Sequence, residues 1–252
     1  FDLHMTILWI CVAIGVVVFG VMFWSIIAHR KSKGHKPANF HENTVVEILW
    51  TIIPFAILVI MAVPATATLV DMYDSEEAEV EIKVTGYQWR WRYEYLEQNV
   101  GFFSNLATPR DQISGLEKKG DNYLVEVDEP MVVPTGQKVR LLVTANDVIH
   151  SWWVPDLAVK KDAIPGFINE TWFKIDQPGT YRGQCAELCG VDHAFMPIEV
   201  KAVPPDEYTA WLDSRREAAV AEAAGAGREW SMDELMERGE ATYATYCAAC
   251  HQ

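Results

Sequence analysis

One short stretch of the chain gathers side chains that bind soft metal ions. It contains Cys185, Cys189, His193 and Met196, which supply two thiols, an imidazole and a thioether. Sulfur ligands together with imidazole favour copper over magnesium, calcium or manganese. A second imidazole is available from His150, which begins the sequence His-Ser-Trp-Trp on another predicted strand. This set of residues predicts a copper site.

Three other interpretations compete with that one. A disulfide between Cys185 and Cys189 suits an oxidising compartment, but it needs neither the histidines nor Met196. Structural zinc sites rarely use methionine, and their ligand spacings generally differ from this one. A mononuclear blue-copper site takes one cysteine, two histidines and a weak axial methionine, so the second cysteine is surplus. Two thiolates can instead bridge two copper ions, an arrangement that suits outer-sphere electron transfer.

A second redox motif ends the chain. Cys247, Cys250 and His251 fit the pattern C-x-x-C-H, in which both thiols form thioethers to haem and the histidine is the proximal iron ligand. A terminal disulfide is the alternative. The motif predicts a covalently bound haem c. Because no residue after Gln252 supplies a distal ligand, we expect the native chain to continue.

The elements that must position the copper ligands are strands. Apolar and polar residues alternate from 80 to 95, which predicts strands with one buried face. The interval 98–121 shows no period and predicts a long loop. Short strands separated by turn sequences favour an all-β sandwich. Further strands are predicted at 123–127, 138–144, 148–154, 168–175 and 196–202.

Two uncharged segments precede the strands, at residues 3–28 and 48–70. Each exceeds the roughly 20 residues that cross a bilayer as a helix. The intervening loop, residues 29–37, is basic, and acidic residues follow the second segment, so the positive-inside rule places the loop in the cytoplasm and both termini outside. A signal peptide is the alternative for the first segment, but its apolar core is usually only about 7 to 15 residues long. We predict a two-helix transmembrane hairpin in contact with lipid.

The region after the strands has a helical pattern. Residues 217–227 are rich in Ala, Glu and Gly and predict a linker. Ser231 followed by Glu234 predicts a capping box at the start of a further helix. The expected organisation is a hairpin at 1–74, a sandwich at 75–204, a helix and linker at 205–227, and an incomplete third module at 228–252.

The charge of the chain limits its partners. The sequence has 35 acidic and 21 basic residues, a net charge of −14. Such a balance excludes a general nucleic-acid-coating protein, which needs clustered Lys and Arg. An acidic surface instead attracts basic partners.

Four blocks of the sequence resemble subunit II of the haem-copper cytochrome c oxidases. They are EILWTIIP at 47–54, GYQWRW at 86–91, HSWWVP at 150–155, and 185–196. The resemblance runs from the first helix to about Ala202, and it implies a cupredoxin-like sandwich that carries the binuclear copper centre CuA. The copper ligands that it implies are His150, Cys185, the backbone carbonyl of Glu187, Cys189, His193 and Met196.

The resemblance also implies roles for three further groups. Trp89 matches the position at which electrons enter, although packing on the sheet is the usual role of such a side chain. The carboxylate of Glu187 would reach a magnesium ion shared with subunit I. Glu47 matches a glutamate at the mouth of a proton channel, and its alternative is an anchor at the membrane interface. Tyr87 stands where the family usually has histidine.

The haem motif indicates the subgroup whose subunit II carries a fused, α-helical cytochrome c domain. The expected function is to pass electrons from c-type haem through CuA to subunit I, which reduces oxygen and pumps protons. Expected partners are subunit I, other membrane subunits and cytochrome c, at a bacterial-type inner membrane with the CuA domain on the periplasmic side. A membrane-tethered copper carrier and a quinol oxidase subunit II are the alternatives. Copper stoichiometry and lability distinguish the carrier, and a quinol oxidase subunit would lack the copper ligands.

Overall fold

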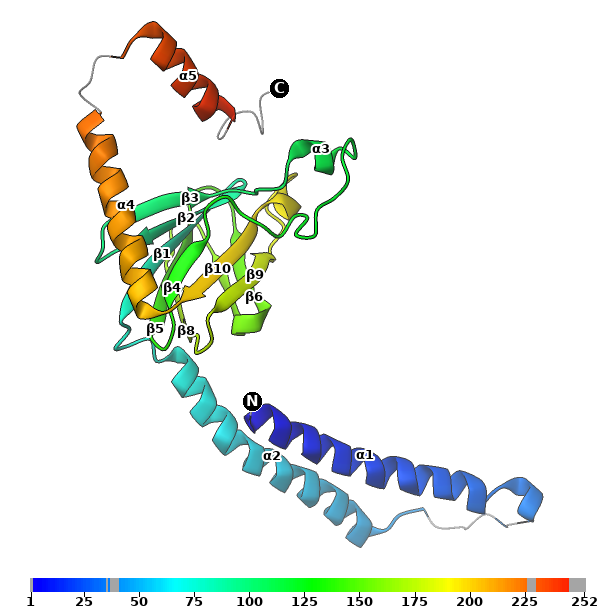
Figure 1. Ribbon diagram of the computed structural model, residues 1–252. Coiled ribbons are helices and arrows are strands. Elements are labelled where there is room, and N and C mark those ends of the chain that lie inside the picture. The colour runs from blue at the N-terminus through cyan, green and yellow to red at the C-terminus, as the bar shows by residue number, and fades with distance from the viewer. Residues whose placement is uncertain (1, 35, 37–40, 226–229, 245–252) are drawn as a thin grey trace. The chain divides into compact units, whose positions relative to one another are not determined.

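The computed structural model describes residues 2–34, 36, 41–225 and 230–244. It divides into two compact units, residues 1–76 and 77–252 (Figure 1). The first unit holds the long apolar helices, and the second holds the strands and the C-terminal helices. The haem motif, Cys247, Cys250 and His251, lies outside the described residues.

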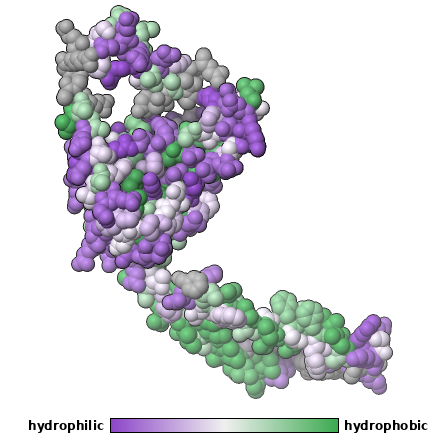
Figure 2. All heavy atoms as spheres, in the orientation of Figure 1, coloured by the Kyte–Doolittle hydropathy of each residue, from purple (hydrophilic) through white to green (hydrophobic). Residues whose placement is uncertain are grey.

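Two long helices make up most of the first unit. α1 spans Asp2–Ala28 and α2 spans Thr44–Tyr73, with the short 3-10 helix η1 at Lys31–Lys33 between them. Both long helices have the length and composition to cross a membrane, and none of their described residues is buried. Figure 2 shows a largely hydrophobic surface over them. The two helices expected at 3–28 and 48–70 therefore form.

The second helix begins earlier than its uncharged segment. Asn43 is the N-cap, and its side-chain oxygen accepts a hydrogen bond from the backbone N–H of Val46 at 3.2 Å. Glu47 lies near the start of α2, where a negative charge is favourable because the helix dipole is positive at that end. A search for uncharged residues stops at Glu47 and so misses the first turn.

Ten strands in the described part of the second unit form a β-sandwich of two five-stranded sheets (Figure 1). The first sheet has the order β3-β2-β1-β5-β8, and the second has the order β4-β10-β9-β6-β7. The strands are β1 Val80–Tyr87, β2 Arg90–Tyr95, β3 Val100–Ser104, β4 Met131–Pro134, β5 Lys138–Ala145, β6 His150–Val154, β7 Val159–Ala163, β8 Asn169–Lys174, β9 Gly179–Cys185 and β10 Pro197–Val203.

Alternating residues of the strands form the core between the sheets. Burial alternates strictly along β5, as the period of two predicts. The core includes Ile82 of β1, Trp91 of β2, Leu141 of β5, Trp152 of β6 and Ile198 of β10, all fully buried. Burying such apolar side chains contributes roughly 25 cal/mol per Å² removed from water. The core thereby fixes the strand ends that carry the candidate ligands.

The alternation at 80–95 forms two strands, β1 and β2. β1 and β2 pair as antiparallel neighbours, with Tyr87 opposite Arg90. Gln88 and Trp89 form the turn between them. Trp89 is therefore a half-buried turn residue rather than a strand residue, and it still packs against the core as expected.

Two expectations about the interval 98–127 are wrong. The strand predicted at 123–127 does not form, because Leu124 has a left-handed backbone with φ +63° and Val127 makes only an isolated bridge, to Leu106. The loop predicted at 98–121 contains β3. Its adjacent Phe102 and Phe103 break the period of two, which hides the strand from a pattern search.

The helix α4, Pro205–Gly225, follows β10 and contacts β3 and β4. Trp211 packs its ring against Tyr95, Phe102 and Tyr208, with centroids 5.2, 6.1 and 6.0 Å away. We call these four residues the α4 aromatic cluster. Arg215 of the same helix pairs with Glu129. These contacts attach α4 to the sandwich.

The linker predicted at 217–227 is helical as far as Gly225, because Ala and Glu are strong helix formers. The next helix, α5, spans Met232–Thr242. The Ser231 hydroxyl accepts from the N–H of Glu234 at 3.3 Å, and the Glu234 carboxylate accepts from the N–H of Ser231 at 2.9 Å. The predicted capping box is confirmed.

Candidate metal centre

Three strand ends of the second sheet carry candidate ligands. His150 is the first residue of β6, Cys185 is the last residue of β9, and Met196 directly precedes β10. β9 runs antiparallel to both β6 and β10, so these three ends lie at one edge. Cys189 and His193 lie in the connection from β9 to β10. Strand pairing therefore brings His150 to residues far from it in the sequence.

The sulfur atoms of three residues lie close together. Sγ of Cys189 is 3.9 Å from Sγ of Cys185, 3.5 Å from Sδ of Met196 and 3.6 Å from Nδ1 of His193. The three sulfur-bearing residues are at most 4 % exposed. Both cysteines are free thiols, as a metal site requires.

His150 leaves one ring nitrogen available to a metal. Its Nε2 lies 2.8 Å from Oδ1 of Asp147. With the proton on Nε2, the ring donates to this carboxylate and keeps the lone pair of Nδ1. Nδ1 is buried and has no hydrogen-bond partner among the described residues. A ring nitrogen of His150 and the sulfurs of Cys185 and Cys189 all lie within 4.8 Å of one another.

A buried polar atom without a partner costs about 1–3 kcal/mol, and a metal ion at this position would offset that cost. Metal-bound histidines generally donate their other ring N–H to a carboxylate or carbonyl, which is the contact that His150 makes with Asp147. Two thiols, a thioether and imidazole suit copper. The residues present therefore fit a CuA-type copper site.

The two thiols differ in acidity. Burial alone would raise the pKa of Cys185, but the neighbouring His150 and backbone groups lower it to about 7. Burial and the charge of Cys185 raise the pKa of Cys189 to about 12. The metal-free pair therefore holds one thiolate more readily than two, and copper binding must displace the remaining thiol proton.

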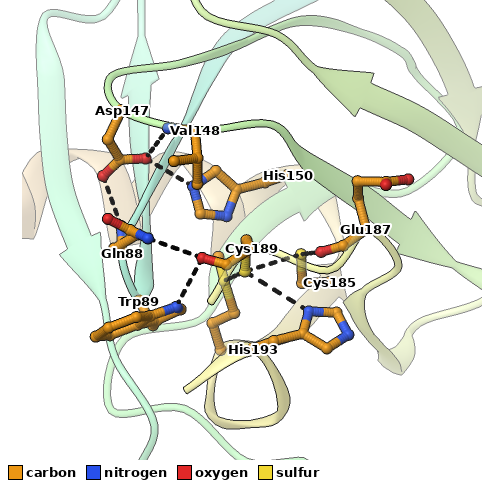
Figure 3. A network of polar contacts seen from close by, with 10 residues as sticks. Gln88, Trp89, Asp147, Val148, His150, Cys185, Glu187, Cys189 and His193 are labelled. Atoms are coloured by element: carbon orange, nitrogen blue, oxygen red, sulfur yellow. Dashed lines mark hydrogen bonds and ion pairs between the residues drawn. The ribbon is translucent and has the colours of Figure 1, made fainter. Parts of the chain in front are cut away.

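The turn between β1 and β2 contacts the loop that carries Cys189 directly (Figure 3). Nε2 of Gln88 and Nε1 of Trp89 both donate to the carbonyl oxygen of Cys189, at 2.8 and 3.2 Å. The N–H of Gln88 donates to Oδ2 of Asp147 at 2.8 Å. One hydrogen-bond network thus joins Trp89, the backbone of Cys189 and the ring of His150.

Glu187 presents its two functional groups in different directions. Its carbonyl oxygen lies 3.3 Å from Sγ of Cys185, whereas its side chain points away from the sulfur atoms in Figure 3. The residue is exposed. The carbonyl faces the candidate copper site, and the carboxylate remains available to a different ion or partner.

Glu47 belongs to the helical unit and not to this centre. It is exposed, and its carboxylate accepts a hydrogen bond from the N–H of Asn43 at 3.3 Å. This contact supports the N-terminus of α2.

The sequence interpretation missed Asp147 and Gln88. Asp147 lies three residues before His150, so a search for carboxylates beside a ligand histidine could have found it. Gln88 lies 101 positions from the carbonyl that it contacts. Nothing in its local pattern indicates that contact.

Comparisons with known proteins agree with the fold. Residues 80–203 match the family model described as cytochrome c oxidase subunit II, periplasmic domain, and residues 1–67 match the model of its transmembrane domain. Neither match extends to the C-terminal helices.

Similar proteins cover most of the chain. A probable cytochrome c oxidase subunit 2 of Rickettsia bellii is 40% identical over 216 residues, covering 86% of this chain and 79% of that protein. Cytochrome c oxidase subunit 2 of Cereibacter sphaeroides is 39% identical over 223 residues, covering 83% and 74%.

Among solved structures, the periplasmic domain of cytochrome oxidase subunit II of Bradyrhizobium japonicum matches with a TM-score of 0.52 and 41% identity, over 57% of this chain and 98% of that one. The chain therefore belongs to the cytochrome c oxidase subunit II family: it is a subunit of cytochrome c oxidase, with transmembrane helices and a periplasmic domain.

Proposed function

We propose that this subunit receives electrons at a binuclear CuA centre and passes them to the subunit that reduces oxygen. The contact between the two free thiols, with the unpartnered Nδ1 of His150 beside them, carries the proposal. When bound, the copper pair would supply a one-electron carrier whose geometry changes little between its redox states.

Six groups of the chain would hold the two copper ions. Cys185 and Cys189 would bridge the pair, because both sulfurs face the same buried space. His150 and His193 would complete one copper each. The weak ligands would be Met196 and the carbonyl of Glu187, which lie within 3.5 Å of Cys189 and Cys185 respectively.

Copper stoichiometry tests the ligand set. We expect two copper ions per chain in the assembled oxidase, retained against a chelator. Cys185→Ser should lose at least one of them, whereas Cys11→Ser, on the exposed face of α1, should lose none. A single labile copper ion in the wild type would contradict the proposal and favour a copper carrier.

Trp89 is the proposed point at which electrons enter. Its indole contacts the backbone of a bridging cysteine directly, so it offers a short route from the surface to the metal. Trp89→Phe should keep the copper spectrum and slow electron uptake by roughly tenfold, which corresponds to about 1.4 kcal/mol in a barrier. Trp172→Phe, on β8, is the matched control and should leave the rate unchanged. Equal rates of electron uptake in Trp89→Phe and Trp172→Phe would exclude Trp89 as the point of electron entry.

A fused cytochrome c remains a proposal that rests on the sequence motif. Cys247, Cys250 and His251 would hold a covalent haem c, and the capped helix α5 before them would open that domain. Haem should stay bound to the denatured wild-type chain and be lost from Cys247→Ala/Cys250→Ala. Loss of haem from the denatured wild type would show that the motif serves another purpose.

Two further roles concern neighbouring subunits. The outward carboxylate of Glu187 would bind magnesium shared with subunit I, and Glu47 would lie at the mouth of a proton channel. Glu187→Gln should reduce magnesium content without removing copper, because the carbonyl that faces copper is retained. Glu47→Gln should reduce proton uptake while α2 stays helical, since Gln can keep the contact with Asn43.

The proposed setting is a bacterial-type inner membrane. The basic loop between α1 and α2 would lie in the cytoplasm, and both termini and the sandwich would lie in the periplasm. The proposed divisions of the chain are those expected from the sequence, with a hairpin at 1–74, a CuA domain at 75–204, a connecting region at 205–227 and a cytochrome c domain beginning at 228. The partners would be subunit I, the other membrane subunits and cytochrome c.

A further inference from the structure

Gly86 of β1 has no room for a side chain. A Cβ atom placed there would lie 2.7 Å from Cδ2, 2.9 Å from Cγ and 3.1 Å from Cβ of His150. Real Cβ atoms essentially never approach another atom more closely than 3.0 Å. The backbone conformation does not require glycine here, because Gly86 does not have a positive φ. Glycine is needed because an imidazole occupies the space beside it.

The backbone of Gly86 is held on both sides. β1 is the middle strand of its sheet, and Gly86 pairs with Trp91 on β2 and with Ala145 on β5. Its carbonyl oxygen accepts a hydrogen bond from the N–H of Asn146 at 3.0 Å. A side chain at this position therefore cannot be accommodated by a simple shift of the strand.

The His150 imidazole is also fixed in position by its neighbours. His150 is fully buried, its Nε2 lies 2.8 Å from Asp147, and the centroid of its ring lies 5.9 Å from that of the buried Trp91. Asp147 is in turn fixed by the N–H groups of Gln88 and Val148, at 2.8 and 2.7 Å. The ring thus lies against the Cα of Gly86 and is hydrogen-bonded to a fixed carboxylate.

We propose that Gly86 is a positioning residue for the copper centre: by lacking a side chain, it sets where the His150 imidazole lies and where Nδ1 points. The inference rests on the proposed role of His150 as a copper ligand. Glycine in a strand interior is unfavourable for the strand itself and often marks a close approach of another group, here the imidazole. A displaced ring would present Nδ1 to the sulfur pair at a different angle.

Gly86→Ala tests this role, with Gly101→Ala as the matched control. Gly101 lies on the edge strand β3, and a Cβ there would meet its nearest atoms at 3.5 Å, an ordinary contact. The full chain in detergent, labelled with isotopic histidine, is measured by NMR without metal and by EPR and redox titration with copper. Gly86→Ala should shift the His150 ring resonances and alter the copper hyperfine pattern and potential. Gly101→Ala should match the wild type in all three measurements.

Unchanged His150 resonances in metal-free Gly86→Ala would overturn the inference. If the wild type itself shows no electron shared by two coppers, the proposed function fails, whereas the metal-free NMR comparison still decides whether Gly86 positions the ring. The two failures are therefore distinguishable.

A double variant covers the case in which Gly86→Ala does not fold. His150→Ala removes Cγ and Cδ2, the two ring atoms that a Cβ at Gly86 would meet within 3.0 Å, and so removes the cause of the clash. Gly86→Ala should therefore destabilise the His150→Ala chain less than it destabilises the wild type in denaturant unfolding, and a Gly86→Ala chain that does not fold should fold once His150→Ala is added. Equal destabilisation in both backgrounds, or no restored folding, would count against the inference.

Discussion

At the scale of single residues, two of the candidate ligands, His150 and Cys189, are held by neighbours that are not themselves candidate ligands. Asp147 orients His150, and the paired donors Gln88 and Trp89 hold the carbonyl of Cys189. Such contacts fix a ligand before the metal arrives and reduce the rearrangement on binding. The candidate centre is therefore preorganised by residues on β1, the β1–β2 turn and the loop before β6.

Met196→Leu should retain copper and raise its reduction potential. Leucine has a similar volume, so the cost to folding should stay below about 1.5 kcal/mol. The variant removes the thioether sulfur that lies 3.5 Å from Cys189, and losing a donor disfavours the oxidised site. Redox titration of the copper signal measures the change.

Met131→Leu is the matched control, because Met131 is equally buried but lies on β4. It should leave the potential at the wild-type value. A potential that is unchanged or lowered in Met196→Leu would argue that this sulfur is not a copper ligand.

The candidate ligand residues can be named from the sequence, but the residues that hold them in place cannot. Cys185, Cys189, His193 and Met196 lie within one short segment, so their spacing alone indicates a shared site. Gly86 and His150 meet because β1 and β6 face each other across the sandwich. That contact depends on sheet packing, which no local pattern encodes.

At the scale of elements, strand pairing decides where the ligands lie. β9 runs from Gly179 to Cys185 and was not predicted, because its residues do not alternate between apolar and polar. It forms because β6 and β10 both supply hydrogen-bond partners. β-propensity depends strongly on such neighbours, which explains why a strand with a central position escaped a search for periodicity.

The α4 aromatic cluster should stabilise the sandwich without influencing the metal. β10 begins beside Met196 and ends beside α4, so the cluster and the centre lie at opposite ends of that strand. Trp211→Ala should cost about 2–3 kcal/mol, somewhat less than a fully buried tryptophan, and should leave the copper spectrum unchanged. Denaturant unfolding measures the cost.

Val220→Ala provides the comparison, because this side chain of the same helix is 69 % exposed. It should change stability by no more than about 0.5 kcal/mol. Equal effects of the two substitutions would show that α4 does not pack through its aromatic residues.

The β6–β7 pair should contribute a pH-dependent term to stability. The hydroxyl of buried Ser151 donates to Asp162 at 2.8 Å, and this bond lowers the pKa of the Asp162 carboxyl from its ordinary 3.8. A carboxylate whose pKa is lower in the folded chain stabilises the fold above its unfolded pKa, and that contribution disappears as the pH falls through the folded pKa.

Asp162→Asn should therefore lower the free energy of unfolding near neutral pH and should differ less from the wild type below a pH of about 4. The effect should be modest, because the Asp162 side chain is 46% exposed. Denaturant unfolding across this pH range measures it. Asp156→Asn, at an exposed position in η2, Pro155–Leu157, is the matched control for removing a carboxylate and should change stability at neutral pH by no more than about 0.5 kcal/mol. A difference between wild type and Asp162→Asn that grows in acid would contradict the assignment.

At the scale of the whole molecule, net charge should govern how fast the electron donor associates with the chain. The net charge of −14 favours encounter with a basic c-type cytochrome. Raising the ionic strength from about 0.01 M to about 0.15 M shortens the screening length from about 30 Å to about 8 Å. The second-order rate of electron transfer should fall by about tenfold or more over this range.

A small neutral reductant serves as the control, because its encounter rate depends little on screening. Stopped-flow measurements with both donors separate the effect of charge on the encounter rate from the rate of electron transfer itself. A rate with the basic cytochrome that is flat or rises with salt would show that the acidic surface does not steer the donor.

The central claim is that Cys185 and Cys189 bridge two copper ions, and EPR of the copper-loaded oxidase tests it most directly. We predict hyperfine structure from one electron shared equally by two copper nuclei, and loss of that pattern in Cys185→Ser. A wild-type spectrum from a single copper ion, or the shared-electron pattern persisting in Cys185→Ser, would contradict the account.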